Sequence, residues 1–220
     1  MATTGKPPPR GGLYETQKNY YKSLYSSGGP EPWDGFFDGA WLAERLRLGP
    51  APKNGLALDI GAGKGRGANI LAKAGLRCVG MDYLLAPMLE AAGAGAKNGP
   101  AFINADLMQA PFKDGVFDLA LDWGVFHHIR RKETGLYIRP LLRLLAKDGR
   151  LLLGCFSTKF RHEGEEKRKR NFTLHKGHYD RYSTRQELEK TFGPHFWIER
   201  IDERQEGYYL LDMRAKGKQE

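Results

Sequence analysis

The sequence predicts a doubly wound α/β fold, an open and mainly parallel sheet with helices on both faces. From Gly55 onward, short apolar runs alternate with helical stretches, and a glycine-rich turn follows the first apolar run. Each helix in such an alternation returns the chain to the same edge of the sheet, which makes the strands parallel. A chain of 220 residues with 40% hydrophobic composition is long enough for one such core and too short for two enzyme domains.

The chain begins with a polar tail and a helical cap. Residues 1–12 are rich in Pro, Gly, Lys and Arg, so they cannot bury apolar surface and are predicted to be disordered. Residues 13–220 form one domain, and its first part, the cap of residues 13–50, is predicted to hold two short helices broken at Gly28-Gly29-Pro30. Several aromatic residues of the cap fit either a lid over a ligand or ordinary packing of amphipathic helices. They include Tyr21, Tyr25, Trp33 and Trp41.

The elements of the sheet follow in order after the cap. Apolar runs of five to eight residues predict strands, and the amphipathic stretches between them predict helices. The predicted strands are residues 56–60, 76–82, 101–106, 116–123, 149–156, 196–202 and 208–214, and the predicted helices are residues 66–74, 86–94, 132–146 and 184–192.

The turn after the first strand is the strongest indication of a ligand site. Asp59-Ile60-Gly61-Ala62-Gly63-Lys64-Gly65 lies directly between a strand and a helix. Its glycines permit a tight turn and a close approach of backbone N–H groups, and the helix presents its positive end to an anionic group. Gly63, Gly65 and Ala68 also satisfy the G-x-G-x-x-A pattern of dinucleotide sites, so the turn alone leaves the ligand open.

Acidic residues at neighbouring strand ends narrow the choice of ligand. Asp59 would repel a pyrophosphate and attract an ammonium group such as the amino group of methionine. Asp82, at the end of the second strand, can accept hydrogen bonds from a ribose diol, with Tyr83 packed against adenine. Asp106 is placed to accept from the adenine amino group, while Leu107 donates its N–H to the ring. Each acid alone also fits a helix cap.

Taken together, these motifs resemble the class I methyltransferases, which use S-adenosylmethionine as cofactor. LALDIGAGKGRG is similar to their first motif, GMDY to their second, NADLMQAPFKDGVFDLALDWGVFHHI to their third and fourth, and LLRLLAKDGRLLLGCFS to their fifth. The resemblance covers residues 30–156, and some phrases are most similar to the thiol and thiopurine methyltransferase branch. It implies a Rossmann-like sheet of seven strands with the last one antiparallel. It also adds Gly61, Gly63 and Asp122 to the expected cofactor contacts.

Methyl transfer from a sulfonium needs little acid–base machinery, because the thioether leaves readily. A thiolate or carboxylate acceptor needs no base, whereas a phenol, alcohol or protonated amine does. The candidate base is His128, in the phrase DWGVFHHI at the end of the fourth strand, although both of its histidines also fit a purely structural role. Trp33, Trp123, Arg161 and Tyr179 are the candidate acceptor contacts.

The charge of the chain suggests an acidic partner or simply solubility. The net charge is +9, and residues 158–181 form a basic insert that contains the run Lys167-Arg168-Lys169-Arg170. This insert follows the fifth strand, so we expect either a lid over an anionic small-molecule acceptor or a solvated surface. No apolar run is long enough to cross a bilayer, so we expect a cytoplasmic protein without membrane contact. Cys78 and Cys155 lie in apolar runs and are expected to be reduced thiols, and no metal site is predicted.

Three other functions remain open at this stage. A nucleic-acid methyltransferase fits the basic charge, but the chain lacks an Asn-Pro-Pro-Tyr phrase after the fourth strand. A nicotinamide-dependent oxidoreductase shares the fold, but Asp59 disfavours it, and so does the lack of a catalytic Tyr-x-x-x-Lys arrangement after the first predicted strand. A binding protein without turnover is the third. The sequence does not name the acceptor or the oligomeric state.

Overall fold

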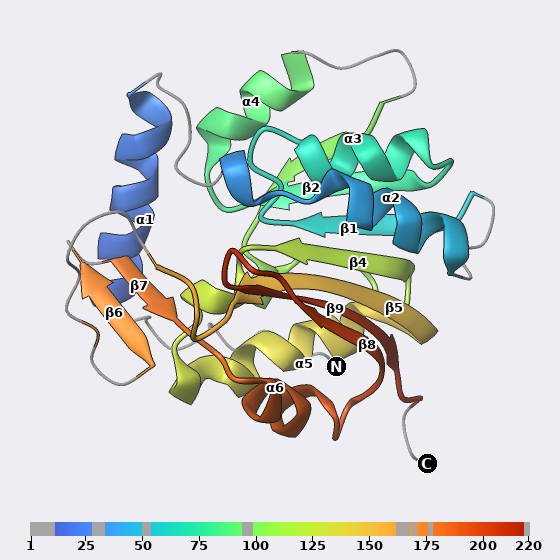
Figure 1. The fold of residues 1–220 in the computed structure, drawn as a ribbon. Helices are drawn as coiled ribbons and strands as arrows, with labels where there is room; N and C mark the ends of the chain where they lie inside the picture. The colour runs from blue at the N-terminus through green and yellow to red at the C-terminus, as the bar shows by residue number, and fades with distance from the viewer. Residues whose placement is uncertain are drawn as a thin grey trace, which may run out of the picture.

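A computed structural model describes residues 12–27, 34–49, 54–93, 99–161, 168, 171–175 and 178–217. It contains one seven-stranded sheet, in the order β3-β2-β1-β4-β5-β9-β8, and a separate hairpin of β6 and β7 (Figure 1). Strands β1 to β5 are parallel to one another, and β9 is antiparallel to both β5 and β8. The predicted Rossmann-like α/β fold with an antiparallel last strand is therefore confirmed.

The elements lie close to the predicted boundaries. Residue types explain this agreement, because the strands are continuous apolar runs and each helix carries one apolar stripe. The strands of the sheet are β1 (Leu56–Ile60), β2 (Arg77–Asp82), β3 (Ala101–Asn104), β4 (Phe117–Trp123), β5 (Leu145–Phe156), β8 (Phe196–Glu203) and β9 (Tyr208–Ala215). The helices are α1 (Gly12–Ser26), α2 (Gly39–Leu48), α3 (Arg66–Lys73), α4 (Leu85–Gly93), α5 (Thr134–Leu144) and α6 (Arg185–Phe192).

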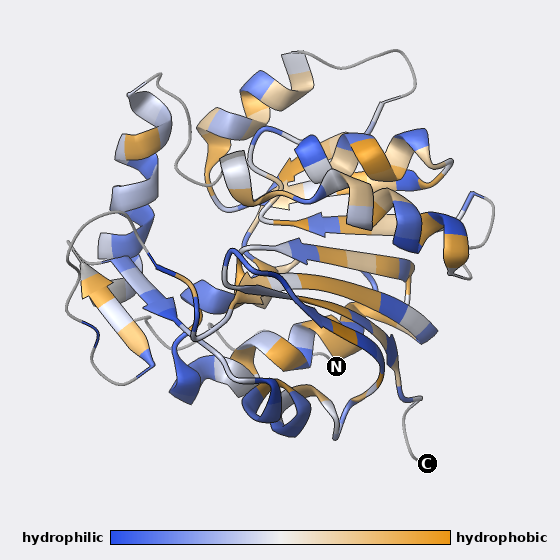
Figure 2. Ribbon diagram, viewed as in Figure 1, coloured by the Kyte–Doolittle hydropathy of each residue, from blue (hydrophilic) through white to orange (hydrophobic). Residues whose placement is uncertain are grey.

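Alternating side chains of the strands build a core on each face of the sheet. Ala57 and Leu119 pack with α2 and α3 on one face, whereas Leu58 and Ala120 pack with α5 and α6 on the other. Apolar residues are concentrated in the central strands, as the orange segments of Figure 2 show, while α1 is mostly hydrophilic. This pattern follows from the period of two in a strand, which sends successive side chains to opposite faces.

Helix α1 stands apart from the other helices, beyond the carboxyl ends of β1 and β4 (Figure 1). Beside it lies the hairpin of β6 (Phe172–His175) and β7 (His178–Arg181), which the sequence did not predict. Strand β7 belongs to the expected basic insert, and it is held from outside by the Arg131 guanidinium, which donates to the carbonyl oxygens of Asn171 and Tyr182. The insert therefore carries a folded part next to α1.

Two further expectations bear on the chain as a whole. Helix α1 starts at Gly12, the last residue of the expected tail, and residues 1–11 lie outside the described part. Cys78 and Cys155 are free and buried, as predicted. Among the described helices, none combines the length and the apolarity that a membrane-spanning segment requires.

Candidate active site

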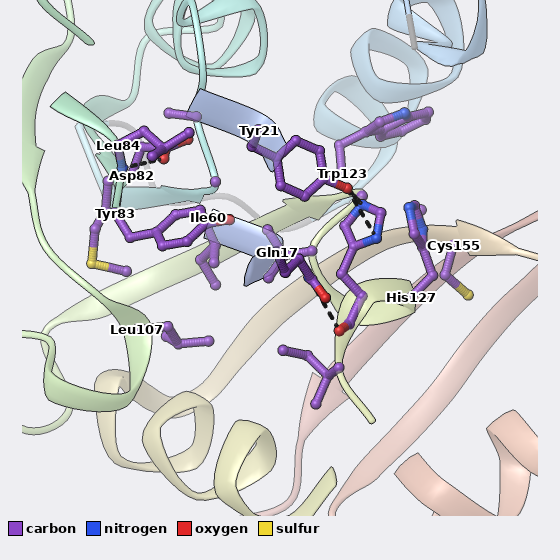
Figure 3. Close-up of a pocket in the computed structure, with 18 of the residues that line it drawn as sticks. Gln17, Tyr21, Ile60, Asp82, Tyr83, Leu84, Leu107, Trp123, His127 and Cys155 are labelled. Atoms are coloured by element: carbon purple, nitrogen blue, oxygen red, sulfur yellow. Dashed lines mark hydrogen bonds between the residues drawn. The ribbon is translucent and has the colours of Figure 1, made fainter. Parts of the chain in front are cut away.

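A pocket of about 370 Å³ opens at the carboxyl ends of β1, β2 and β4, under α1. Figure 3 shows Asp82 and Tyr83 on one side of this pocket, Trp123 and His127 on the other, and Tyr21 of α1 between them. Parallel strands with helices on both faces leave a crevice at this edge, where the chain reverses its direction of winding. The sheet order places that reversal between β1 and β4.

The glycine-rich turn after β1 forms one wall of the pocket. Gly61 has a φ of 67°, in the left-handed region, and a Cβ atom at this position would lie 2.3 Å from Val125. Only glycine meets both conditions without strain. The Gly61 N–H donates to the carbonyl oxygen of Met81 at 2.8 Å, which fixes the turn against β2. Gly61 lines the pocket, and Gly63 lies next to it, where its N–H donates to Asp82.

Asp59 lies at the base of the pocket, where its carboxylate is almost fully buried. The Ala68 N–H, in the first turn of α3, donates to Oδ2 of Asp59 at 2.7 Å. Burial, with the charges of Asp82 and Asp122, raises the pKa of Asp59 to about 7, although the Ala68 N–H opposes this shift. A cation bound beside Asp59 would favour its ionised form and lower this pKa. The site therefore suits an ammonium group and disfavours a pyrophosphate.

Asp82 at the end of β2 has the geometry of a diol acceptor. Its Oδ1 accepts from the Leu84 N–H at 2.8 Å, and its Oδ2 accepts from the Gly63 N–H at 3.0 Å. A carboxylate offers about four lone-pair positions, so two remain for hydroxyl groups of a ligand. Burial raises the pKa of Asp82 to about 6, although the backbone N–H groups oppose this shift.

Helix α1 covers this end of the pocket. The Tyr14 hydroxyl donates to Oδ2 of Asp106, and the rings of Tyr14 and Tyr83 are 6.0 Å apart. Asp106 also accepts from the Met108 N–H at 2.9 Å, so it caps a 3-10 helix as well as facing the pocket. Burial raises the pKa of the Tyr83 hydroxyl. Asp106, Tyr83 and Leu107 all line the pocket, and their contacts with a cofactor remain predictions.

The opposite end of the pocket holds a cluster of four polar side chains, which we call the His–Asp cluster: Tyr21, His128, His178 and Asp180. The Tyr21 hydroxyl is 2.6 Å from Nε2 of His128 and 2.6 Å from Nε2 of His178. Oδ1 of Asp180 is 2.8 Å from Nδ1 of His128 and 3.2 Å from Nε2 of His178. Burial raises the pKa of Tyr21 well above its usual value, and the charge of Asp180 adds to the effect.

Three separate segments bring the His–Asp cluster together. Tyr21 comes from α1, His128 from the 3-10 helix Phe126–His128 after β4, and His178 and Asp180 from β7. Of these, the sequence predicted His128 as candidate base, and it left Tyr21 open between a lid and ordinary helix packing. It missed Asp180 as a pocket residue, because a single acid in a basic segment gives no indication of its neighbours. All four side chains line the pocket.

Aromatic side chains form the walls next to the His–Asp cluster. The rings of Phe156 and Phe160 are stacked at 3.8 Å, and Phe36 meets Phe160 edge-on at 5.1 Å. His127 stacks on Phe156 at 3.7 Å and is buried, which agrees with a structural role for this histidine. The Trp123 indole donates to the carbonyl oxygen of Phe36 and lines the pocket, and its contact with an acceptor stays a prediction. This end of the pocket is therefore apolar and flat-walled, apart from its polar cluster.

The expected cofactor contact of Asp122 is corrected by the structure. Asp122 is completely buried on the α5 face, accepts from the Val125 N–H at 2.7 Å and from the Tyr137 hydroxyl, and does not line the pocket. Burial raises its pKa to about 6. Groups of the protein thus hold the Asp122 carboxylate, whereas the next residue, Trp123, lines the pocket. Asp122 supports the turn that carries His128.

Two expected acceptor contacts also lie elsewhere. Arg161 is exposed, and its guanidinium donates to the carbonyl oxygens of Thr158 and Phe160. The Tyr179 side chain faces away from the pocket and stacks on Phe172 at 5.5 Å. Its two neighbours in β7, His178 and Asp180, face the pocket instead. Trp33 lies outside the described residues, and so does most of the basic run, of which only Arg168 is described.

Comparison with known proteins agrees with this geometry. Residues 58–153 match the family described as Methyltransferase domain. The chain is 29% identical over 140 residues to the Mus musculus protein named Probable tRNA methyltransferase 9B, a match that covers 63% of this chain and 30% of that protein. It is 34% identical over 115 residues to the demethylmenaquinone methyltransferase of Corynebacterium urealyticum, covering 52% of this chain and 46% of that protein. The chain thus spans less than half the length of these curated relatives.

Solved structures show the same fold over a larger part of the chain. The 1,6-didemethyltoxoflavin-N1-methyltransferase of Burkholderia thailandensis, solved with 1,6-didemethyltoxoflavin and S-adenosylhomocysteine, has a TM-score of 0.73 and 21% identity, covering 96% of this chain and 93% of that one. An S-adenosylmethionine-dependent methyltransferase from Mesorhizobium loti has a TM-score of 0.65 and 17% identity, covering 81% and 98%. The chain therefore has the fold of S-adenosylmethionine-dependent methyltransferases, and its residues 58–153 are similar to a methyltransferase domain.

Proposed function

We propose that this protein transfers the methyl group of S-adenosylmethionine to a small aromatic acceptor that carries a protic oxygen or nitrogen. The observation that carries the proposal is a single pocket with two different ends. Asp59, Asp82 and Asp106 suit an amino acid and a nucleoside at one end, and aromatic walls with the His–Asp cluster suit a planar acceptor at the other. The donor methyl group then lies between the two ends, in line with the acceptor atom.

The size and cover of the pocket support a small acceptor. Ligand pockets have volumes of about 300–1,000 Å³, and a pocket of about 370 Å³ is at the lower end of this range. Helix α1 closes both ends, through Tyr14 at Asp106 and through Tyr21 at His128. The exclusion of water by such a cover favours the reaction of an ionised acceptor with a sulfonium.

The charges that line the pocket favour a neutral acceptor over the anionic one that the sequence suggested. Lys64 lies 3.1 Å from Glu90, and Arg130 pairs with Glu133. His128, His178 and Asp180 line the acceptor end. Arg66 also lines the pocket, and its guanidinium lies over the Phe37 ring. A neutral phenol, enol or heterocyclic N–H meets no repulsion from Asp180, whereas an anion would. His128 stays a predicted catalytic residue, since it is next to the expected position of the acceptor atom.

A nucleic-acid acceptor is the second candidate. The net charge of +9 and the similarity to a protein named as a tRNA methyltransferase favour it. A base of RNA would have to leave its stack and enter under α1, at a cost of a few kcal/mol. The bicyclic acceptor in the Burkholderia thailandensis structure supports the small-molecule proposal, because that structure covers nearly the whole of both chains.

The test is a panel of acceptors incubated with the protein and S-adenosylmethionine, followed by mass detection of methylated products. The panel holds phenols, N–H heterocycles, thiols, carboxylic acids and unmodified tRNA at matched concentration. We expect product from the phenols or heterocycles, together with stoichiometric S-adenosylhomocysteine. Methylation of tRNA alone, with binding that weakens steeply as salt increases, would replace the proposal by the second candidate. Donor binding without any product would indicate a binding protein.

A further inference from the structure

We propose that the His–Asp cluster binds a divalent transition-metal ion such as Zn²⁺, and that this ion holds the reacting atom of the acceptor. The inference rests on the proposed function, because it assigns a chemical role to the acceptor end of the same pocket. The spacing of the two cysteines predicted no metal site. The four side chains of the cluster are separated by up to 159 positions, from Tyr21 to Asp180, and only the fold brings them together.

The positions of the donor atoms carry the proposal. Nδ1 of His128, Nε2 of His178 and Oδ1 of Asp180 form a triangle with sides of 2.8, 3.2 and 3.2 Å. The Tyr21 hydroxyl lies 3.1 Å from the first nitrogen and 2.6 Å from the second, so it is next to this triangle. Metal–ligand bonds of about 2.0–2.1 Å give a tetrahedron with edges of about 3.3 Å. The ion therefore fits if these donor atoms move apart by a few tenths of an ångström.

The chemistry of the donor set selects the class of ion. Two imidazole nitrogens and one carboxylate suit Zn²⁺ and the other first-row divalent metals, whereas Ca²⁺ and Mg²⁺ prefer oxygen ligands. His127, His128 and Asp180 also offer ligand atoms within 4.8 Å of one another, so a third imidazole is near. Asp180 is 2% exposed and His178 is 11% exposed. A cation would offset the cost of burying this carboxylate.

The surroundings hold the ligands in place and leave one position for the acceptor. The Tyr20 ring lies parallel to the His178 imidazole, 4.6 Å away, and orients it. A catalytic metal site keeps three protein ligands and one exchangeable position. Tyr21 comes from α1 and lies at that position, so an acceptor oxygen or nitrogen that displaces the Tyr21 hydroxyl enters the coordination sphere directly.

The reaction at such a site balances as follows. The acceptor X–H binds the ion through X and releases its proton to solvent, because the metal lowers the pKa of the bound group. The X lone pair then attacks the methyl carbon, and the carbon–sulfur bond breaks with its electron pair moving to sulfur. The products are X–CH₃ and neutral S-adenosylhomocysteine. The methylated acceptor is a weaker ligand, so it dissociates from the ion.

The test measures metal binding directly on the full chain without an affinity tag. Protein freed of metal by a chelator is titrated with Zn²⁺ by calorimetry and with Co²⁺ by visible absorption, which reports tetrahedral coordination. We expect one ion per chain, a strong tetrahedral Co²⁺ spectrum, and at least 30-fold weaker binding by Asp180→Ala and by His178→Ala. His195→Gln, a histidine in the loop before β8 and outside the pocket, is the matched control and should bind as the wild type does. Unchanged thermal unfolding and donor affinity of the variants establish that they are folded.

The outcomes separate this inference from the proposed function. A wild-type protein that binds no Zn²⁺ or Co²⁺ above the level of the two cluster variants overturns the metal site. If that protein still methylates small protic acceptors, the proposed function stands and His128 alone is the candidate base. If the wild-type protein instead binds one ion at the cluster but yields no methylated product from the panel, the metal site stands and the proposed function fails.

Discussion

Replacement of Asp82 by Asn should weaken donor binding about 10- to 150-fold. Each carboxylate oxygen of Asp82 already accepts one backbone N–H, from Leu84 and from Gly63, which leaves one position on each for a ribose hydroxyl. The amide of Asn keeps one of these oxygens and loses the other. The loss of one charge-assisted hydrogen bond costs about 1.5–3 kcal/mol, which gives the range stated. Calorimetric titration of both proteins with S-adenosylhomocysteine at pH 8 measures this change in affinity.

The pH dependence of binding gives a second measure of the same interaction. The pKa of Asp82 in the free protein is about 6 and that of Asp59 is about 7, so both lose their charge as the pH falls towards 5. Wild-type affinity should fall with a slope of about two decades per pH unit below pH 6, and the affinity of the Asn variant with a slope of about one.

The same two carboxyl groups affect the stability of the fold. Because their pKa values are raised, the folded chain binds more protons than the unfolded chain between about pH 4 and 7, so their contribution to the free energy of unfolding increases as the pH falls.

A matched control separates this effect from a general change of charge. Asp148 is an exposed residue with a φ of 61°, which Asn adopts readily, and it lies outside the pocket. Asp148→Asn should leave donor affinity and its pH slope unchanged. If Asp82→Asn binds within twofold of the wild type, or if its pH slope equals that of the wild type, Asp82 does not hold the ribose and the assignment of the donor end is wrong.

Two further predictions concern stability. Tyr137→Phe removes the hydroxyl that donates to buried Asp122, so we expect a loss of about 1.5–3 kcal/mol and a fall in Tm of about 3–12 °C at pH 8. The pKa of Asp122 is about 6, so scanning calorimetry at pH 5 should give a smaller fall, and equal falls at both pH values would show that its ionisation does not matter. Arg150→Met leaves the Asp212 carboxylate buried without the guanidinium 2.6 Å away and should cost about 3–5 kcal/mol in urea unfolding. The double variant with Asp212→Leu should recover most of this loss, and no recovery would contradict the ion-pair explanation.

Much of the fold could be predicted because its signals are local. The five parallel strands are apolar runs of fixed spacing, and the glycine-rich turn before α3 marks the edge of the sheet at which ligands bind. The β6–β7 hairpin could not be predicted in this way. Its strands are only four residues long, and contacts from outside stabilise it, such as those of the Arg131 guanidinium with the carbonyl oxygens of Asn171 and Tyr182.

The donor end of the site follows from the sequence more fully than the acceptor end. Asp59 and Asp82 are fixed by their places at the ends of predicted strands, whereas Asp180 and His178 reach the pocket only through the unpredicted hairpin. Asp122 was expected at the cofactor because its motif does not reveal the partners that hold its carboxylate. These partners are the Val125 N–H and the Tyr137 hydroxyl, and the fold brings Tyr137 there from α5.

A crystal structure with S-adenosylhomocysteine tests the central claim most directly, because it locates the donor relative to the His–Asp cluster. We predict that the ribose hydroxyls bind Asp82, that the amino group lies beside Asp59, and that the sulfur faces Tyr21 and His128 across the acceptor end of the pocket. A ligand bound outside this pocket, or one whose sulfur faces away from the cluster, would contradict the account.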